Sequence, residues 1–161
     1  MSATGTPATA ALVAAGVPFT LHEYDHDPAV TDFGREAARR LGLDPLRVFK
    51  TLIVDAGGGR PGLAVAIVPV AGLLDLKAMA RALGVKKVEL AAPKAAELSS
   101  GYIVGGISPI GQKTPLPAIV DETAELFDTV FVSGGRRGLD IELSPADLLR
   151  VIGGRTADIA R

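Results

Sequence analysis

The hydrophobic pattern of the chain is strongest between residues 48 and 69. Two apolar runs, VFKTLIV and LAVAIVP, flank a stretch of three glycines at 57–59. Such an arrangement is typical of a β-hairpin with a glycine-rich loop. In the first run, period-two alternation places Lys50 on one face together with Val48, Leu52 and Val54.

Helices with an apolar face are predicted on both sides of this hairpin. Thr6 followed by Pro7 is a favourable start for a helix that ends at Gly16. Asp32 can cap a second helix, in which residues spaced by four share a face, and Gly42 ends it. Asp75 is expected to open a third helix that ends at Gly84, and further helical segments are expected over residues 93–98, 122–127 and 144–153.

Short alternating segments predict the remaining strands, over residues 19–24, 88–90, 118–121, 129–133 and 139–143. Between them lies GYIVGGISPIGQKTPLP, in which glycine and proline interrupt a strand-like pattern. Glycine this dense indicates that the backbone comes close to something. The strands and helices do not alternate regularly, so the sequence predicts an α+β fold, in a single domain over residues 1–161.

Composition excludes several classes of chemistry. The chain has 161 residues, of which 48% are apolar, and it contains no cysteine. Disulfides, thiolate nucleophiles and Cys-based metal sites are therefore ruled out. The lack of cysteine favours a reducing, cytoplasmic compartment, and no apolar run is long enough to suggest a membrane span.

The net charge of −1 argues weakly against proteins that coat nucleic acid, and no DNA partner is expected. Basic residues nevertheless cluster in three places, at 35–50, 77–87 and 136–137. Such clusters on amphipathic helices are usually solvated faces, although a local patch could contact a nucleic acid.

The two histidines do not predict a metal site. His22 and His26 are four residues apart, but Pro28 and the strand-like alternation argue against the helical geometry that such a metal pair requires. No G-x-S-x-G motif is present, and GGISPIGQK lacks the spacing of a phosphate-binding P-loop. We therefore expect neither a metal nor a nucleotide cofactor.

Two charged residues in strands are candidates for chemistry. Lys50 interrupts an aliphatic face, so it must either reach water at a sheet edge or line a polar pocket that binds phosphate or carbonyl oxygen. Asp140 and Glu142 share one face of LDIEL, as is ordinary for an antiparallel strand with one side in water. The preceding residues 133–138 indicate a flexible turn rich in hydrogen-bond donors.

Four segments, taken in order, resemble one family. FKTLIV, PVAGLLDLKAMARALGVKKVEL, GYIVGGISPIGQK and VSGGRRGLDIEL are similar to the YbaK/EbsC family of bacterial Cys-tRNA(Pro) deacylases, which are related to the editing domain of bacterial prolyl-tRNA synthetases. The similarity runs from about Thr6 to the end of the chain. It implies a mixed, largely antiparallel sheet of six or seven strands, barrel-like, with flanking helices.

The resemblance also implies a function. Members of the family are trans-editing enzymes that hydrolyse the ester of mischarged Cys-tRNA(Pro), with the thiolate of the substrate cysteine as the attacking group and no cofactor. The expected partners are the acceptor end of tRNA(Pro) and prolyl-tRNA synthetase. Editing is needed because a binding pocket separates near-isosteric amino acids by only about 1–3 kcal/mol. The alternatives are an Ala-tRNA(Pro) or broader deacylase, a non-enzymatic module that binds tRNA ends, and an inactive structural or regulatory domain.

The family motifs assign roles to seven residues of this chain. Lys50 is expected to bind the 3′-terminal nucleotide through phosphate or ribose oxygens. Gly105 and Gly106 are expected to bring backbone N–H groups to the aminoacyl ester, where they would stabilise the developing oxyanion. The resemblance implies four further substrate-binding residues, namely Tyr24, Phe33, Ser133 and Asp140.

Overall fold

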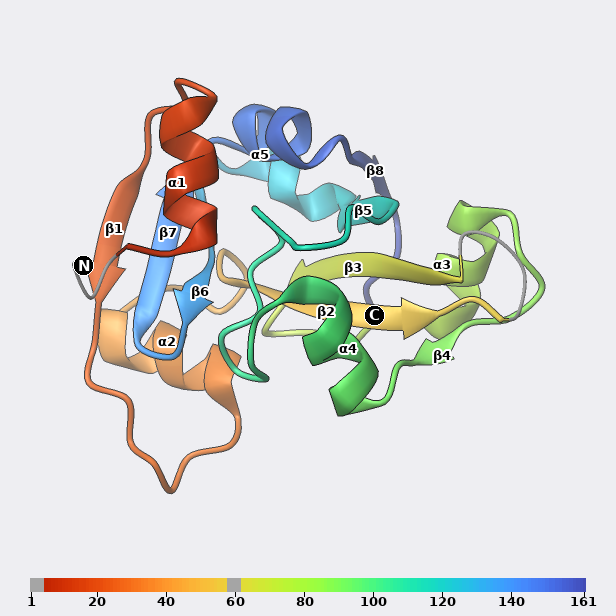
Figure 1. The fold of residues 1–161 in the computed structure, drawn as a ribbon, viewed down its shortest axis with the longest axis horizontal. Helices are drawn as coiled ribbons and strands as arrows, with labels where there is room; N and C mark the ends of the chain where they lie inside the picture. The colour runs from red at the N-terminus through yellow and green to blue at the C-terminus, as the bar shows by residue number, and fades with distance from the viewer. Residues whose placement is uncertain (1–4, 58–61) are drawn as a thin grey trace.

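The computed structural model describes residues 5–57 and 62–161, which form two sheets with helices packed around them (Figure 1). One sheet has three antiparallel strands in the order β1 (Thr20–Glu23), β7 (Leu139–Leu143) and β6 (Val130–Arg136). The other has five strands in the order β4 (Glu89–Leu90), β2 (Phe49–Asp55), β3 (Leu63–Pro69), β5 (Ala118–Asp121) and β8 (Arg155–Ala157).

The α+β class is confirmed, but the expected barrel-like closure is wrong. In the five-stranded sheet β4, β2 and β3 pair antiparallel, whereas β5 and β8 add in parallel, so the sheet is mixed. The two sheets are open, and an isolated parallel bridge between Val48 and Phe131 connects them in place of a continuous ladder. The described residues contain eight strands, one more than the upper expectation, because the three-residue β8 was not predicted.

The predicted helix ends are largely confirmed. Thr6 accepts a hydrogen bond from the Thr9 amide and forms a capping box at the start of α1 (Pro7–Ala14). Asp75 accepts from the Ala78 amide at the start of α3 (Leu76–Leu83), at 3.0 Å. Asp32 precedes α2 (Phe33–Leu41) but makes no side-chain cap hydrogen bond and contacts Arg35 instead. The other helical segments are α4 (Pro93–Ser100), η1 (Glu122–Leu126) and α5 (Pro145–Ile152). No helix of the described residues is long and apolar enough to cross a membrane.

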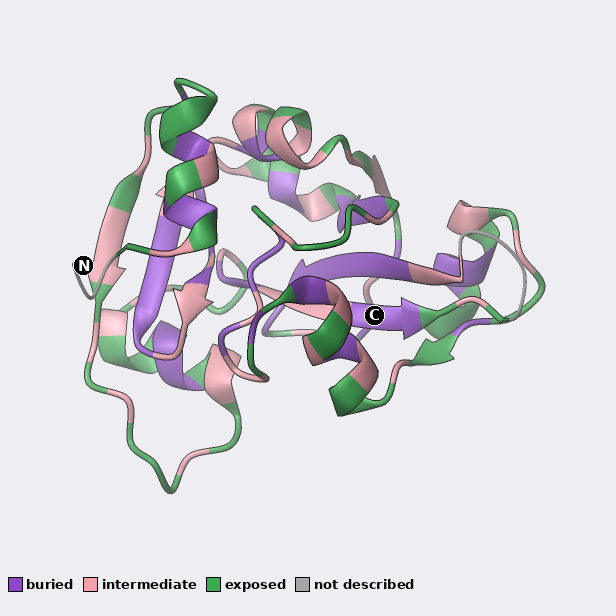
Figure 2. Ribbon diagram, viewed as in Figure 1, coloured by how far each residue is buried: buried purple, intermediate pink, exposed green. Residues whose placement is uncertain are grey.

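The hairpin of β2 and β3 is confirmed, with Phe49 opposite Pro69 and Asp55 opposite Leu63. The predicted loop glycines at 58 and 59 lie outside the described residues. Figure 2 shows β3 as a largely buried strand, because helices cover both faces of its sheet. One face packs on α3 and the other on α4, which explains why LAVAIVP is apolar at consecutive positions. The core residues on the α3 side include Val54, Ala66, Val68 and Met79, and those on the α4 side include Ile53, Val65, Ile67 and Ala96.

The segment expected to be a flexible turn is mostly strand. β6 continues to Arg136, with a register irregularity between Ser133 and Arg136, and the reversal takes only Arg137 and Gly138. A β-bulge of this kind absorbs extra residues without ending the strand, which alternation alone does not reveal. The bulge redirects the chain beside the segment over residues 101–117.

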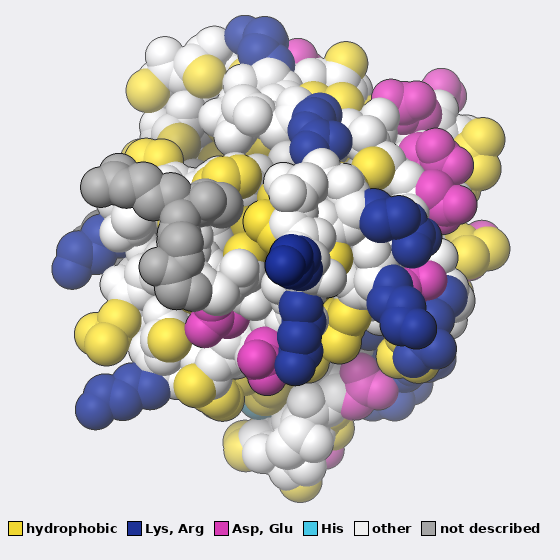
Figure 3. All heavy atoms as spheres, turned by 90° about the vertical axis from the view of Figure 1, so that its right-hand side faces the viewer, with side chains coloured by type: hydrophobic (Ala, Val, Ile, Leu, Met, Phe, Trp, Pro, Cys, Tyr) yellow, Lys and Arg dark blue, Asp and Glu magenta, His cyan; other side chains and the backbone are white. Residues whose placement is uncertain are grey.

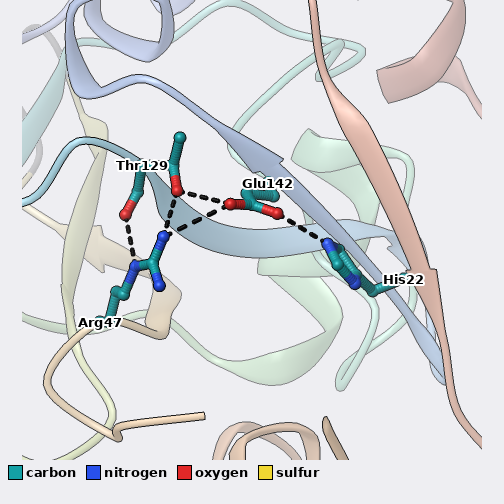
Figure 4. A network of polar contacts seen from close by, with 4 residues as sticks. All are labelled: His22, Arg47, Thr129 and Glu142. Carbon is teal, nitrogen blue, oxygen red and sulfur yellow. Dashed lines mark hydrogen bonds and ion pairs between the residues drawn. The ribbon is translucent and has the colours of Figure 1, made fainter.

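A network of polar side chains joins the three-stranded sheet to the start of β2 (Figure 4). Glu142 of β7 accepts hydrogen bonds from Thr129 at 2.6 Å and from Arg47 at 3.4 Å, and its other oxygen lies 2.9 Å from His22 Nε2. Arg47 also donates to the Thr129 hydroxyl and, at 2.8 Å, to the Thr129 carbonyl. Glu142 is therefore a structural carboxylate, shared by three segments of the chain.

Candidate active site

A cavity of about 430 Å³ lies where the edge of β2 meets the three-stranded sheet. Its wall comes from β2, β6, β7, the start of α2 and the segments around residues 90–96 and 104–107. Six of the seven residues singled out by the family motifs line it, namely Tyr24, Phe33, Lys50, Gly105, Ser133 and Asp140. The rest of the wall is mainly apolar. The fold thus brings together residues that are up to 116 positions apart, counting from Tyr24 to Asp140 (140 − 24).

The edge of β2 forms one side of the cavity. β4 pairs with β2 only at Val54 and Asp55, and the Ile53 carbonyl accepts from the Ala91 amide at 3.0 Å. Alternate residues of a strand direct their backbone groups to the same edge, so the N–H and C=O of Thr51 face the cavity side. The buried Thr51 hydroxyl has no hydrogen-bond partner among the described residues. Sequence reasoning missed Thr51, although a hydroxyl beside Lys50 in an aliphatic strand was an available signal.

Lys50 reaches the cavity wall from β2 and donates a hydrogen bond from Nζ to the Gly72 carbonyl, at 3.0 Å. Partial burial lowers the pKa of its ammonium group; nearby Asp32 opposes this shift and Arg35 adds to it. An ammonium group has three donors, so Lys50 can hold Gly72 and still present two N–H groups to a ligand. Lys50 therefore lines the cavity wall, and its role in binding phosphate or carbonyl oxygen stays a prediction.

Asp140 overturns the expectation of a strand with one side in water. It is only 5% exposed, because α2 covers this outer face of the sheet through a contact cluster of Ala38 with Phe131. Its carboxyl group has no hydrogen bond or ion pair among the residues that the structure describes. Burial raises the pKa of Asp140 to about 7, since the charged form loses water without gaining a partner.

Tyr24 and Ser133 complete the polar side of the cavity. Burial, with a smaller contribution from the charge of Asp140, raises the pKa of Tyr24 to about 12, so its hydroxyl stays protonated at neutral pH. Ser133 is the cross-strand neighbour of Asp140, and its Oγ accepts from the Gly135 amide at 3.2 Å. These groups are a protonated phenol, a hydroxyl and a carboxyl around one apolar space.

A buried carboxylate that the sequence did not predict fixes the segment between Tyr24 and Phe33. Glu36 of α2 is 1% exposed and contacts His26 Nδ1 at 2.6 Å and the Asp27 amide at 2.9 Å. Burial raises its pKa, but these hydrogen bonds outweigh that effect and hold the pKa below its ordinary value. No sequence signal connects positions 26 and 36, because the pairing depends on how the loop folds back on α2.

The two histidines lie apart, each beside its own carboxylate. His22 contacts Glu142 and His26 contacts Glu36. In the described part of the chain, no group of three or more His, Cys, Asp or Glu side chains is arranged to hold a metal ion. Both histidines thus serve to connect segments of the fold.

The two adjacent glycines have different surroundings. Gly105 has φ +91°, and a Cβ there would lie 2.8 Å from Arg137 Nε and from the ring of Phe33. Gly106 is buried outside the cavity wall, against the backbone of Arg136, and its N–H donates to the Ile103 carbonyl at 2.8 Å. The close approach that the sequence predicted is therefore an approach to other parts of the protein. Only Gly105 of the pair faces the cavity.

Basic side chains also occur away from the cavity. Figure 3 shows the face around α3 and β4, where groups of Lys and Arg side chains lie beside acidic ones. This mixture of signs agrees with a net charge near zero. It does not make a strongly basic face over this side of the molecule.

The model of the aminoacyl-tRNA editing domain matches residues 27–151 of this chain. The chain belongs to the aminoacyl-tRNA editing domain family. Its resemblance to YbaK/EbsC proteins is confirmed by an Enterococcus faecalis protein (strain ATCC 700802 / V583) named "Putative Cys-tRNA(Pro)/Cys-tRNA(Cys) deacylase EbsC". The two are 40% identical over 147 residues, which cover 89% of this chain and 85% of that protein.

Solved structures share the whole fold of this editing domain. One is described as a "putative trans-editing enzyme for prolyl tRNA synthetase"; it has a TM-score of 0.84 and 28% identity over 100% of this chain and 99% of that one. Another, described only as a hypothetical protein, has a TM-score of 0.84 and 27% identity, covering 97% of this chain and 100% of that one. This chain therefore has the same overall fold as these two proteins.

Proposed function

We propose that this editing domain hydrolyses the ester bond of mischarged aminoacyl-tRNA, with Cys-tRNA(Pro) as its substrate. The observation that carries the proposal is the cavity, in which a lysine, an unpaired buried carboxyl group and a glycine backbone surround a mainly apolar space. The family match and the name of the Enterococcus relative support the same activity.

Lys50 is the proposed contact for the terminal nucleotide of the tRNA. Its Nζ is anchored by the Gly72 carbonyl, so the ammonium group is held in one place at the cavity wall. The two remaining N–H donors suit phosphate or ribose oxygens, and fixing them in advance reduces the entropy lost when the substrate binds. Tyr24 and Phe33 would form the surface against the adenosine and the aminoacyl group.

Asp140 is the proposed partner of the substrate's α-ammonium group. A carboxylate that lies buried without a partner is unfavourable, and an incoming cation would supply the missing charge. A carboxyl group with a pKa of about 7 is partly ionised near neutral pH. A cation beside it would lower this pKa and so complete the ionisation. Ser133, its cross-strand neighbour, borders the same part of the cavity.

The chemical step needs no nucleophile from the protein, because the ester is already activated. The substrate thiolate attacks its own carbonyl carbon, a C–S bond forms, and negative charge builds on the carbonyl oxygen. The C–O bond to the ribose then breaks, the ribose oxygen takes up a proton, and water opens the cyclic thioester. In this proposal the N–H of Gly105 stabilises the oxyanion, whereas that of Gly106 stays with Ile103.

The amino-acid preference follows from the size and chemistry of this space. The mainly apolar wall fits a small side chain, and the attack requires a thiol on that side chain. Choice of tRNA would come from prolyl-tRNA synthetase in a transient complex; one structural relative is described as a trans-editing enzyme for that synthetase. Comparing Cys-tRNA(Pro) with Cys-tRNA(Cys), with and without the synthetase, tests this part separately.

A panel of mischarged tRNAs tests the function. Cys-tRNA(Pro) should lose its ester rapidly, and Ser-tRNA(Pro) and Ala-tRNA(Pro) far more slowly. Equal rates on all three would assign the attack to water, and preference for alanine would assign the Ala-tRNA(Pro) alternative. Binding of tRNA without ester loss would leave the non-enzymatic module.

Substitution of Lys50 tests the site in the same assay. Lys50→Ala should lower kcat/KM by about 10²-fold or more, because it removes a charged contact that is fixed at the substrate. The matched control is Lys87→Ala, which removes the same charge from an exposed position away from the cavity wall. Comparable activity in the two variants would contradict the role of Lys50.

A further inference from the structure

Arg137 lies outside the cavity wall, yet it contacts the part of the wall that the proposed reaction uses. Its Nε and Nη2 both donate to the Val104 carbonyl, at 3.0 and 2.7 Å. Its guanidinium carbon lies 4.6 Å from the centre of the Phe33 ring. No carboxylate pairs with it among the described residues, so its guanidinium group contacts a carbonyl and an aromatic face.

The Val104 carbonyl and the Gly105 N–H belong to the same peptide group. A trans peptide directs these two atoms to opposite sides, so a carbonyl held toward Arg137 turns the N–H away from it. Val104 and Gly105 line the cavity and Arg137 does not. We therefore infer that an N–H directed away from Arg137 is directed toward the cavity. The described residues give the Gly105 N–H no acceptor, which leaves this donor available to a ligand.

Contacts of the adjoining peptide and of Gly105 restrict the rotation of this peptide. On one side the Val104 N–H donates to the Glu97 carboxylate of α4, at 2.8 Å. On the other, the place of a Gly105 side chain is filled by Arg137 and the Phe33 ring. Two hydrogen bonds from a cation also polarise the peptide group, and this strengthens its N–H as a donor.

We propose that Arg137 is a positioning residue that directs and polarises the Gly105 N–H toward the carbonyl oxygen of the aminoacyl ester. This inference rests on the proposed deacylase function. It assigns to the second arginine of GGRRG a task in the chemical step, whereas a basic residue in such a turn would otherwise be read as a contact for tRNA phosphate. A positioning residue would change the rate of deacylation at saturating enzyme, whereas a phosphate contact would change the strength of tRNA binding.

Single-turnover deacylation of Cys-tRNA(Pro) with enzyme in excess separates them. Arg137→Met keeps an unbranched apolar stem over Phe33 and removes both donors, so it should lower the saturating rate about 10-fold to 100-fold, less than loss of a whole oxyanion donor. The enzyme concentration at half-saturation should change by less than about 3-fold. Arg137→Lys keeps the positive charge but not the paired N–H donors of the guanidinium group. Its saturating rate should therefore lie between those of wild type and Arg137→Met.

Arg136→Met is the matched control, because it removes the same charge from the preceding residue, at the end of β6. It should leave the saturating rate within about 3-fold of wild type. Weaker half-saturation at an unchanged rate in Arg137→Met would overturn the proposal in favour of phosphate binding. Equal rate losses in the two Met variants would also overturn it, because the loss would then not be specific to Arg137. If Arg137→Met does not fold, the comparison of Arg137→Lys with wild type decides.

A second readout is independent of activity. The backbone amide resonance of Gly105, followed by ¹H–¹⁵N NMR without substrate, should move more in Arg137→Met than in Arg136→Met. An unmoved Gly105 resonance would overturn the positioning role whatever the kinetics. Failure of wild-type enzyme on every mischarged tRNA would instead overturn the proposed function, and the NMR comparison would still decide whether Arg137 orients this peptide.

Discussion

Asp140 and Glu142 lie two residues apart on the same face of β7, yet their surroundings are opposite. Glu142 accepts hydrogen bonds from Thr129 and Arg47 and contacts His22 (Figure 4). Hydrogen bonding, led by Thr129, holds its pKa below the ordinary value despite partial burial. Asp140 has no such partner among the residues that the structure describes, and burial raises its pKa to about 7.

We interpret Glu142 as a carboxylate that stabilises the fold and Asp140 as one that binds a ligand. A buried acid that served stability would be expected to have its hydrogen bonds satisfied, as Glu142 does. An acid that lowers the stability of the free protein is instead typical of functional sites, where strain is retained for binding. The contrast predicts opposite outcomes when each acid is changed to its amide.

The largest expected effect is on the activity of Asp140→Asn. The amide has the same shape but cannot pair with an ammonium group as a carboxylate does, so kcat/KM on Cys-tRNA(Pro) should fall about 10³-fold. Deacylation kinetics measure the loss, and a thermal unfolding curve shows that the variant is folded. Wild-type kinetics in Asp140→Asn would show that Asp140 has no role in deacylation.

The second effect is on the pH dependence of stability. The pKa of Asp140 is raised on folding, so the folded state binds more protons than the unfolded state between about pH 4 and 7. Its contribution to stability is therefore complete below about pH 4 and is lost as the pH rises to about 7. Urea unfolding of wild type and Asp140→Asn should diverge over this range by roughly 3 kcal/mol, with the variant gaining.

A difference that stayed constant with pH would show that Asp140 titrates normally in the folded protein. Glu142 should give the reverse dependence, because its pKa is lowered on folding. Its contribution is present above the unfolded pKa of about 4.3 and is lost as the pH falls through the folded value. Comparing the free energy of unfolding of wild type and Glu142→Gln over the acidic pH range isolates that contribution.

The third effect is on stability in Glu142→Gln at neutral pH. Removing the charge weakens contacts to Thr129, Arg47 and His22 at once, and hydrogen bonds to charged groups contribute about 1.5–3 kcal/mol. We expect the free energy of unfolding to fall by about 2 kcal/mol while kcat/KM stays within about 3-fold of wild type. A large loss of activity in this variant, measured with fully folded enzyme, would mean that the network also supports the cavity.

Local sequence patterns predicted much of the fold, because helix caps, helix ends and the hairpin depend on residues that are close in sequence. The caps at Thr6 and Asp75 and the stop at Gly84 depend on neighbours within a few residues, and each formed as predicted. The hairpin followed from two apolar runs and a glycine loop. β8 was missed because three residues, Arg155–Ala157, carry no readable alternation; the strand forms by pairing with β5 in parallel.

The site was only partly predictable, for a physical reason. Alternation in LDIEL divides the strand into two faces, but whether the polar face meets water depends on α2, which packs over it from about 100 residues away in sequence. The buried pair of Glu36 with His26 and the peptide held by Arg137 likewise arise from tertiary contacts. The family motifs placed Asp140 at the site, whereas the residue pattern alone placed it in water.

The smallest expected effect concerns Thr51, whose buried hydroxyl has no hydrogen-bond partner among the described residues. In this it resembles the carboxyl group of Asp140. Thr51→Val removes the unsatisfied hydroxyl at nearly constant shape, so the free energy of unfolding should rise by about 0.5–1 kcal/mol. Thr123→Val is the matched control, because that hydroxyl donates to Asp121 at 2.5 Å, and its loss should lower stability by about 1–2 kcal/mol. Urea unfolding of the two variants measures both changes. If Thr51→Val is instead destabilising, its hydroxyl has a partner in solution, and Asp140 would stand alone as the unsatisfied polar group of the cavity wall.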